Sequence, residues 1–578
     1  MGRLLTIWFL AVLAAQSPAV ADYESGILPP ILVKGETPHT ISLAERMAEL
    51  HVAGLSIAYV HEGKIAWTRT YGATRFGGPA VTPDTLFQAA SISKPVTALA
   101  VLHLAQEGKL DLDRDVNLYL KSWKVPGSQK VTLRQLLTHT AGISVHGFRG
   151  YDLGTPLPSL IQMLDGQPPA NSGAIRVVAE PGANWKYSGG GYLIIRQVLE
   201  DTTGQPFAKL MQDLVLKPIG MTRSSYDQPL AAARLAEAAT PYDGDGKELT
   251  EGPHVYPEMA PDGLWTTPSD LARYVIEVQN ALSGKANHVI SPEMTRAMLT
   301  PSLADQGLGP VVVDDLFWHE GGNSGFQCLF AGFAKGGDGA VIMANSENGA
   351  ELAGEIMRTI GHDRGWPNFT SEDREAVSLD PAVAARYAGF YRLGRYSLAE
   401  ADLEQGKLYL ILPGEAKARI YPAAEREWFF SDQEASVTFN PAAQGIEPAM
   451  VLHRFGADSA FRRINAERAK QVQDEFAAKL KNQTPDPAAE AALRRHLAEW
   501  RSGEPDYSRM VRYLADEVKD DLAEMKEKMG RLGPIKSVAF TGVDHYGGDL
   551  YKVTFENGEM SWHILVDLRG MTEQLGFI

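Results

Sequence analysis

The sequence predicts an α+β fold, because strand-like segments stand at both ends of a long stretch whose middle has helical periodicity. Between about residue 41 and residue 361, short apolar runs alternate with longer segments in which apolar residues recur with helical spacing. Each such segment must bury its apolar face against another element. We therefore expect one domain in which the N-terminal and C-terminal strands share a sheet.

The strands of this first domain are expected as two hairpins. Residues 55–60 and 65–67 are apolar runs joined by a short turn, and the late runs 327–333 and 339–344 flank a second turn. Helical periodicity fills the chain between the two hairpins. The expected helices are residues 91–106, 133–137, 192–202, 207–215 and 268–282.

After Pro381 the pattern changes to short strands at intervals of about ten residues, which is typical of a small all-β unit. The expected strands are residues 408–412, 418–421, 428–430, 437–439 and 450–454. Helices are expected next at residues 466–481, 488–500 and 507–529, before antiparallel strands that turn at Asn557 and Gly558. The predicted domains are an export signal (1–21), a main domain (22–375), a small β-barrel-like domain (376–465) and an α+β domain (466–578).

The composition is that of a globular protein with more than one domain. The chain has 578 residues, of which 44% are hydrophobic and 22% are charged, and its formal net charge is -16. A strongly acidic chain repels phosphate groups, so neither nucleic acid nor an anionic membrane is expected as a partner. The expected partner is a small-molecule or peptide substrate. The oligomeric state is left open.

The first residues have the pattern of an export signal. Arg3 supplies a positive charge, residues 4–15 are almost entirely apolar, and Ala19 and Ala21 form an A-x-A cleavage site. We expect cleavage before Asp22 and a mature protein that is periplasmic or secreted. The competing interpretation is an uncleaved membrane anchor. The apolar stretch is too short to span a bilayer, so no stable membrane span is expected after cleavage.

Cys328 is the only cysteine, so an intrachain disulfide is excluded. Its neighbours Phe326, Leu329 and Phe330 are apolar. A buried structural thiol is therefore expected here and not a nucleophile.

The most informative feature of the chain is the spacing of Ser91 and Lys94, one turn apart at the start of the helix expected at residues 91–106. Residues i and i+3 share a helical face, so Lys94 can reach the Ser91 hydroxyl while Ser93 points elsewhere. A serine becomes a nucleophile when a neighbouring base takes its proton. The free N–H groups of a helix start also suit a developing oxyanion. The alternative is a helix-start serine beside a surface lysine.

A second candidate segment contains Tyr187, Ser188 and Gly189, just before the helix expected at residues 192–202. A phenol on a rigid turn can shuttle protons if a nearby ammonium lowers its pKa, and Lys94 is the candidate cation. The alternative is a buried tyrosine beside a glycine-rich turn.

A third candidate segment contains His319, Glu320, Gly321 and Gly322 and leads into a strand. Glycines allow a substrate backbone to approach a strand closely, and a free N–H here would serve as a second oxyanion donor. His319 adds a tunable cation or hydrogen-bond donor. The alternative is an ordinary glycine-rich turn with a surface histidine.

These three segments, in this order, resemble the motifs of the serine β-lactamase and penicillin-binding-protein superfamily. The resemblance is strongest to the class C β-lactamase-related serine hydrolases, a group of esterases, D-aminopeptidases and DD-peptidases. Residues 136–142, 218–221 and 263–271 resemble the same family, and the resemblance covers about residues 40–360. It implies an antiparallel sheet flanked by helices, with a helical subdomain. Residues 381–464 resemble the β-rich domains often appended to these hydrolases, and the last hundred residues resemble an NTF2-like α+β cone.

The resemblance also implies roles for individual residues. Ser91 would be the acylated nucleophile, and Lys94 and Tyr187 would share the general base and acid roles. Gly322 would lie near the oxyanion donor. The substrate-binding and oxyanion residues implied in this way are His319, Gly321, Gly322 and Gly189.

Two positions depart from the family pattern. Gly189 stands where the second motif usually has Asn, and His319 stands where the third motif commonly has Lys. Each missing polar contact would cost about 1–3 kcal/mol of transition-state binding to a β-lactam. Efficient β-lactam hydrolysis is therefore not expected.

The sequence thus favours an exported, cofactor-independent serine hydrolase that forms an acyl-enzyme with an ester or a D-amino-acid amide, cell-wall-derived peptides included. A true β-lactamase and a binding or sensor protein with a vestigial site are the alternatives. No cofactor is expected, and no metal site either, because His139 and His146 lie seven residues apart with no further ligand cluster.

Overall fold

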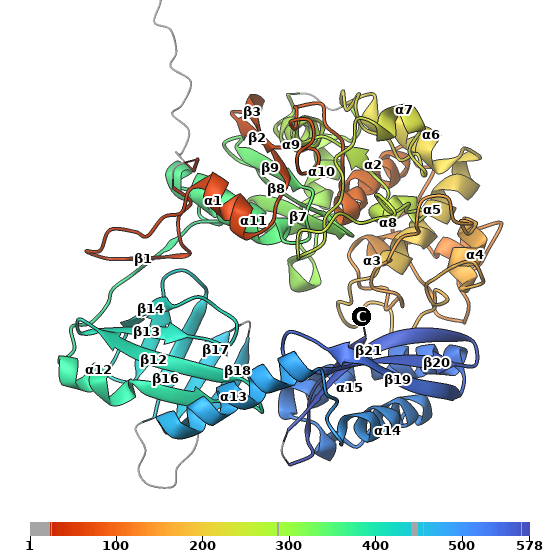
Figure 1. The fold of residues 1–578 in the computed structure, drawn as a ribbon. Coiled ribbons are helices and arrows are strands. Elements are labelled where there is room, and N and C mark those ends of the chain that lie inside the picture. Colours follow the sequence, from red (N-terminus) through yellow and green to blue (C-terminus); the bar gives the residue numbers. More distant parts are fainter. Residues whose placement is uncertain are drawn as a thin grey trace, which may run out of the picture. The chain divides into compact units, whose positions relative to one another are not determined.

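The computed structural model describes residues 23–24, 26–285, 288–440, 449–454, 456–567 and 569–577. This part of the chain divides into two compact units (Figure 1). The first unit contains Thr40–Thr370 together with the described residues before Pro29, and the second contains Pro29–His39 and the described residues from Ser371 onward. The predicted export signal at residues 1–21 lies outside the described residues.

A six-stranded antiparallel sheet with the order β3-β2-β9-β8-β7-β6 forms the base of the first unit. The early strand β2 pairs with the late strand β9, from Leu55 opposite Ala344 to Val60 opposite Gly339. The prediction that both ends of an α+β domain share one sheet is therefore confirmed. The strands are β2 (Gly54–His61), β3 (Lys64–Gly72), β6 (Val311–Val313), β7 (Leu316–Asn323), β8 (Phe326–Phe333) and β9 (Gly339–Ala344).

Helices cover both faces of this sheet (Figure 1). Successive side chains of β2 point to opposite faces, so Ala58 and Val60 pack with helices α2 and α9, while Leu55 and Ile57 pack with α1 and α11. Burial on both faces explains why the strands have nearly continuous apolar runs. The helices of this unit are α1 (Leu43–Glu49), α2 (Ser93–Gln106), α3 (Leu133–Leu137), α4 (Leu160–Asp165), α5 (Gly189–Thr203), α6 (Phe207–Met211), α7 (Ala232–Leu235), α8 (Met259–Asp262), α9 (Pro268–Ser283), α10 (Pro292–Met298) and α11 (Gly349–Arg364).

Short elements complete the first unit. A two-stranded ladder joins β4 (Phe87–Gln88) to β5 (Trp265–Thr266), directly before the predicted nucleophile in the chain. The helix predicted at residues 207–215 is α-helical only to Met211 and continues as a π-helix, η3 (Gln212–Leu216). The other single-turn elements are the 3-10 helices η1 (Ala90–Ile92), η2 (Val116–Leu118) and η4 (Leu303–Asp305).

The second unit contains a closed barrel in which β11 to β18 follow one another and β18 pairs back with β11. The strand β1 (Ile31–Val33), which lies in sequence between the two parts of the first unit, pairs in parallel with β10 (Glu372–Arg374) and packs on Phe429. The predicted boundaries place this N-terminal segment in the main domain, whereas its contacts group it with the barrel. The remaining elements are α12 (Pro381–Tyr387), β11 (Gly389–Arg392), β12 (Leu398–Glu404), β13 (Lys407–Ile411), β14 (Ala418–Pro422), β15 (Glu427–Phe430), β16 (Ala435–Phe439), β17 (Met450–Arg454) and β18 (Ala457–Ile464).

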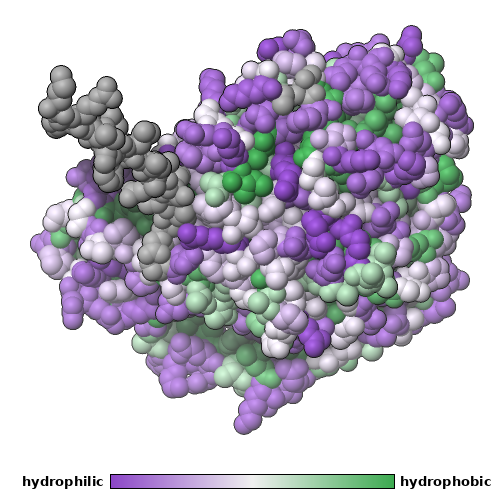
Figure 2. All heavy atoms as spheres, turned by 90° about the horizontal axis from the view of Figure 1, so that it is seen from above, coloured by the Kyte–Doolittle hydropathy of each residue, from purple (hydrophilic) through white to green (hydrophobic). Residues whose placement is uncertain are grey.

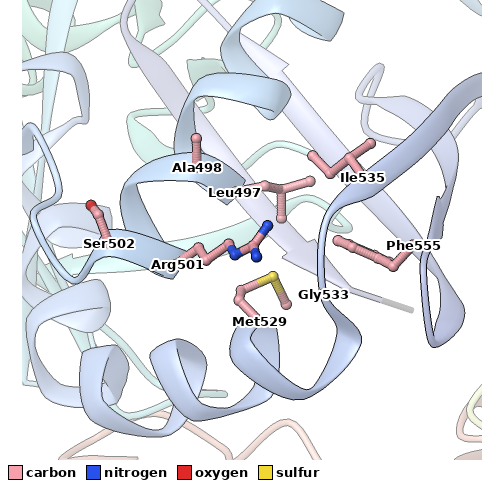
Figure 3. A pocket seen from close by; sticks show the side chains of 8 residues that line it. All are labelled: Leu497, Ala498, Arg501, Ser502, Met529, Gly533, Ile535 and Phe555. Atoms are coloured by element: carbon pink, nitrogen blue, oxygen red, sulfur yellow. The ribbon is translucent and has the colours of Figure 1, made fainter.

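After the barrel, α13 (Ala466–Asn482) leads into a four-stranded antiparallel sheet packed against two helices. A cavity of about 450 Å³ lies beside Leu497 and Phe555, and Arg501 points into it (Figure 3). The likeness of this part to an NTF2-like cone stays a prediction. Its elements are α14 (Ala489–Ser502), η5 (Tyr507–Arg509), α15 (Arg512–Leu532), β19 (Ile535–Val543), β20 (Asp549–Phe555), β21 (Gly558–Val566) and β22 (Thr572–Phe577).

The helices within the described ranges show no membrane-spanning character. None of the helices there combines the length and the apolarity that crossing a bilayer requires. The face of the molecule drawn in Figure 2 is largely hydrophilic, and its apolar residues form small separate patches.

Candidate active site

Ser91 lies in the 3-10 turn η1, immediately before the long helix α2. The first ten residues of α2, from Ser93 to Leu102, are all buried, whereas Ser91 itself is only half-buried. The hydroxyl is therefore reachable on a rigid support. The preceding residue, Ala90, has a left-handed φ of 47°. A non-glycine residue in this region costs about 1–3 kcal/mol, and such strain is concentrated at functional sites.

Lys94 contacts Ser91 as the spacing predicts, and its Nζ donates to Ser91 Oγ at 2.8 Å. The lysine side chain is only 1% exposed. Two further acceptors surround Nζ, the carbonyl of Pro261 at 3.2 Å and Oδ1 of Asp262 at 3.4 Å. All three protons of the ammonium group therefore have an acceptor.

The charge state of Lys94 follows from these contacts. Burial acts to lower the pKa of Lys94, but the negative charge of Asp262 and the phenol of Tyr187 outweigh burial, and the net shift of the pKa is upward. Lys94 is therefore an ammonium at neutral pH. In this state it is a hydrogen-bond donor to Ser91 Oγ. The sequence pattern did not indicate Asp262, which lies just before the family-like stretch at residues 263–271.

Tyr187 precedes α5, and its ring packs against Lys94, whose Nζ lies 4.9 Å from the ring centroid. Imidazole rings contact the same phenol ring, that of His139 at a centroid distance of 4.3 Å and that of His146 at 4.9 Å. His319 lies farther away, at 6.4 Å. The structure thus brings the predicted Tyr187, Lys94 and His319 together, in a setting lined by three histidines.

His139 fixes the segment that carries Tyr187. The His139 carbonyl accepts from the Lys186 amide at 2.8 Å, and its Nδ1 accepts from the Ser188 amide at 3.2 Å, one contact on each side of Tyr187. An accepting Nδ1 requires a neutral ring, and burial together with the Lys94 cation keeps the pKa of His139 well below its ordinary value. The family-like stretch at residues 136–142 was the available sequence signal for this role.

Gly189 is the first residue of α5, and the ring of Phe148 fills the space beside it. A Cβ atom at position 189 would lie 2.8 Å from Cε2 of Phe148 and 3.1 Å from the His146 carbonyl oxygen. A side chain at this position would therefore have to displace Phe148. The family motif usually has an asparagine at this position. Here the ring of Phe148 occupies the neighbouring space and forms an aromatic wall of the site.

The predicted third motif lies on β7. The neighbouring strand β6 pairs with β7 only as far as Trp318, so no described strand covers the outer edge of β7 from His319 onward. A Cβ atom at Gly321 would lie 2.3 Å from the Ala89 carbonyl oxygen and 3.1 Å from the Ser91 nitrogen. The strand and the turn that carries Ser91 can approach this closely only because position 321 is glycine. Gly322 follows on the exposed side, and its oxyanion role stays a prediction.

His319 is neutral in this structure. Its side chain is buried, and its Nδ1 donates to the Glu320 carbonyl at 2.5 Å. Burial and the Lys94 cation lower the pKa of His319 to about 4. The residue can therefore take part in hydrogen bonds at neutral pH, but it does not attract a substrate carboxylate by charge.

Asn323 and Cys328 support the site from behind. The side-chain amide of Asn323 donates to Oε1 of Gln88 at 2.7 Å, which ties the end of β7 to the strand before Ser91. Cys328 is buried as predicted, with its thiol 3.0 Å from the Ala89 carbonyl oxygen, and burial raises its pKa. Within the described ranges, no group of three or more His, Cys, Asp or Glu side chains is arranged to hold a metal ion.

Comparisons with known proteins identify the family of the chain. The model of the Beta-lactamase family matches residues 42–360. The chain therefore belongs to the Beta-lactamase family and is a serine hydrolase of the β-lactamase and penicillin-binding-protein type. The fold predicted from the motifs is confirmed.

Individual relatives span different parts of the chain. Penicillin-binding protein 4* of Bacillus subtilis (strain 168) is 24% identical over 451 residues, which cover 73% of this chain and 97% of that protein. Esterase EstB of Burkholderia gladioli is 33% identical over 214 residues, 34% of this chain and 52% of that protein. The octameric penicillin-binding protein homologue from Pyrococcus abyssi superposes with a TM-score of 0.51 at 21% identity, over 73% of this chain and 98% of that chain, and shares its fold.

The two serines of the motif are expected to behave differently. A fluorophosphonate probe should label the protein at Ser91, and Ser91→Ala should abolish labelling. Ser93 Oγ instead accepts from the Leu264 amide at 3.0 Å. Ser93→Ala should therefore retain labelling but lower the free energy of unfolding by about 1–3 kcal/mol, because a buried amide loses its acceptor. Peptide mapping and chemical unfolding measure both effects, and labelling that survives Ser91→Ala would refute the assignment.

Proposed function

We propose that this protein hydrolyses an ester or a D-amino-acid amide through an acyl-enzyme on Ser91. The observation that carries the proposal is the reachable Ser91 hydroxyl in hydrogen-bond contact with a buried, charged Lys94. The similarity to Esterase EstB supports an acyl-transfer reaction. A vestigial site would not need to keep a nucleophile, a buried cation and a fixed phenol together.

The proposed reaction has two steps. Ser91 Oγ attacks the substrate carbonyl carbon, its proton passes through Tyr187 to the leaving alcohol or amine, and the bond to the leaving group breaks. Water then attacks the acyl-serine ester, and one of its protons passes through Tyr187 to Ser91 Oγ. The bond between Ser91 Oγ and the acyl carbon breaks, which releases the acid and restores Ser91. Lys94 stabilises the negative charge that develops on Ser91, and the backbone N–H groups of Ser91 and Gly322 stabilise the oxyanion.

The neutral His319 and the aromatic wall at Phe148 argue for esters and amides over β-lactams. A β-lactam carries a carboxylate and a side-chain amide, and neither group would meet a charge or an amide at these two positions. An ester or amide with an apolar acyl group would instead contact Phe148.

A substrate panel tests this choice. We expect kcat/KM for the best p-nitrophenyl ester or D-alanyl amide to exceed that for nitrocefin by at least about tenfold, the effect of one lost polar contact. Gly189→Asn should lower every activity, because the new side chain collides with Phe148. Gly189→Asn with Phe148→Ala gives the amide room and should raise nitrocefin hydrolysis relative to ester hydrolysis. Nitrocefin as the preferred wild-type substrate would contradict the proposal.

We also propose that the protein is exported, on the basis of the N-terminal signal pattern. N-terminal sequencing of the protein from the extracytoplasmic fraction should begin at Asp22. Cytoplasmic protein that retains Met1 would overturn this proposal.

A further inference from the structure

A buried acid, Asp262, lies against both Ser91 and Lys94. It is the last residue of the short helix α8, which packs on η1 and α2. Its Oδ1 accepts from Lys94 Nζ at 3.4 Å and from Ser91 Oγ at 3.3 Å. The side chains of Asp262 and Lys94 are 6% and 1% exposed. The two residues therefore form a buried ion pair that touches the nucleophile.

This pair is an unfavourable way to stabilise a fold. Among the described residues, Asp262 Oδ2 has no hydrogen-bond partner although it is buried. Removing a carboxylate and an ammonium from water commonly costs more than their attraction returns, and a buried oxygen without a partner adds to this cost. Stability therefore does not account for an acid at this position. Buried charges arranged in this way are concentrated at functional sites.

We propose that Asp262 is a positioning residue for the reaction, which holds Lys94 as an ammonium locked against Ser91 so that Lys94 acts as a fixed cation and not as a free base. The inference rests on the proposed function, because it takes Ser91 as the nucleophile. When Ser91 loses its proton, the oxygen gains negative charge next to an ammonium 2.8 Å away. A preorganised cation at this distance stabilises that charge without reorganisation. In the proposed reaction Tyr187, whose ring packs against the same cation, then relays the seryl proton to the leaving group.

Other titratable groups face this pair. Most of them cannot be the group whose loss of a proton changes the reaction rate at alkaline pH. His139 and His319 face Lys94. Burial lowers the pKa of both side chains, so both are already uncharged at neutral and alkaline pH. Tyr192 also lies near Lys94, and its pKa is raised by burial. Tyr256 and Glu258 face Asp262, and burial, aided by the charge of Asp262, raises the pKa of Glu258 to about 8. Glu258 is therefore the group that a control must remove.

The test is the pH dependence of the rate at which a fluorophosphonate labels Ser91 in the full-length protein, which requires no natural substrate. In the wild type the rate should fall only at the alkaline pH where Lys94 loses its proton. In Asp262→Asn this fall should move to lower pH by at least about one unit, because the cation has lost its counter-charge. Glu258→Gln, which removes the neighbouring acid, should leave the position of the fall unchanged.

Two outcomes overturn the inference while leaving the proposed function intact. If Asp262→Asn changes the labelling rate by the same factor at every pH and does not shift the pH at which the rate falls, Asp262 does not set the charge of Lys94. If Asp262→Asn labels faster than the wild type at neutral pH, the free amine is the active form. A wild type that is not labelled at Ser91 would instead refute the proposed function, and this inference would fall with it.

A second measurement does not depend on activity. Lys94→Met leaves the buried carboxylate without its counter-charge, and adding Asp262→Asn removes that carboxylate charge. The double variant should therefore melt at a higher temperature than Lys94→Met alone. A double variant that melts at the same or a lower temperature would show that the two side chains do not act as an ion pair.

Discussion

The buried contact between Lys94 and its acidic neighbour Asp262 is the interaction on which the rest of the site depends. A lysine that is 1% exposed would ordinarily lose its proton, because burial penalises the charged form. The adjacent carboxylate reverses this tendency. The resulting cation then determines its surroundings: it contacts Ser91, packs under the ring of Tyr187 and helps to keep His139 and His319 neutral.

Rigid elements hold the reactive groups around this cation. Ser91 stands at the start of a helix that is buried along its first turns, and Tyr187 is held on both sides by hydrogen bonds to His139. The third motif approaches Ser91 along the uncovered edge of β7, and Gly321 makes that approach possible. Three segments that are far apart in the sequence thus come together at one site. A buried helix supports the first, a neutral imidazole holds the second, and a glycine allows the close approach of the third.

Much of the fold could be predicted from periodicity. The shared sheet followed from apolar runs at both ends of the first domain, and α3 and β9 have the predicted bounds. The barrel strands β12 and β18 were missed because their charged residues face outward and interrupt the apolar pattern. The start of α5 was predicted at Tyr192 because three successive glycines do not favour a helix, although it begins at Gly189. Crowding explains two of these glycines, since a Cβ would lie 2.8 Å from Phe148 Cε2 at Gly189 and 2.6 Å from the Ser144 carbonyl oxygen at Gly190.

The candidate site, too, could be predicted from the sequence only in part. The spacing of Ser91 and Lys94 follows from the geometry of one helical turn, so their contact could be predicted. The contributions of Asp262, His139 and Phe148 could not, because each reaches the site by a tertiary contact that no local pattern records. The sequence resemblance indicated Gly189 as a missing amide, whereas the structure shows that Phe148 occupies the neighbouring space.

The central claim is that Lys94 and Tyr187 act as one unit, a fixed cation and the phenol that carries the proton. Measuring kcat/KM of Lys94→Ala, Tyr187→Phe and the double variant tests this claim most directly. Each single variant should lose about 10²-fold or more, and the double variant should be little worse than either, because deleting one member already disables the unit. Losses that multiply in the double variant would show that the two residues act independently and would contradict the claim.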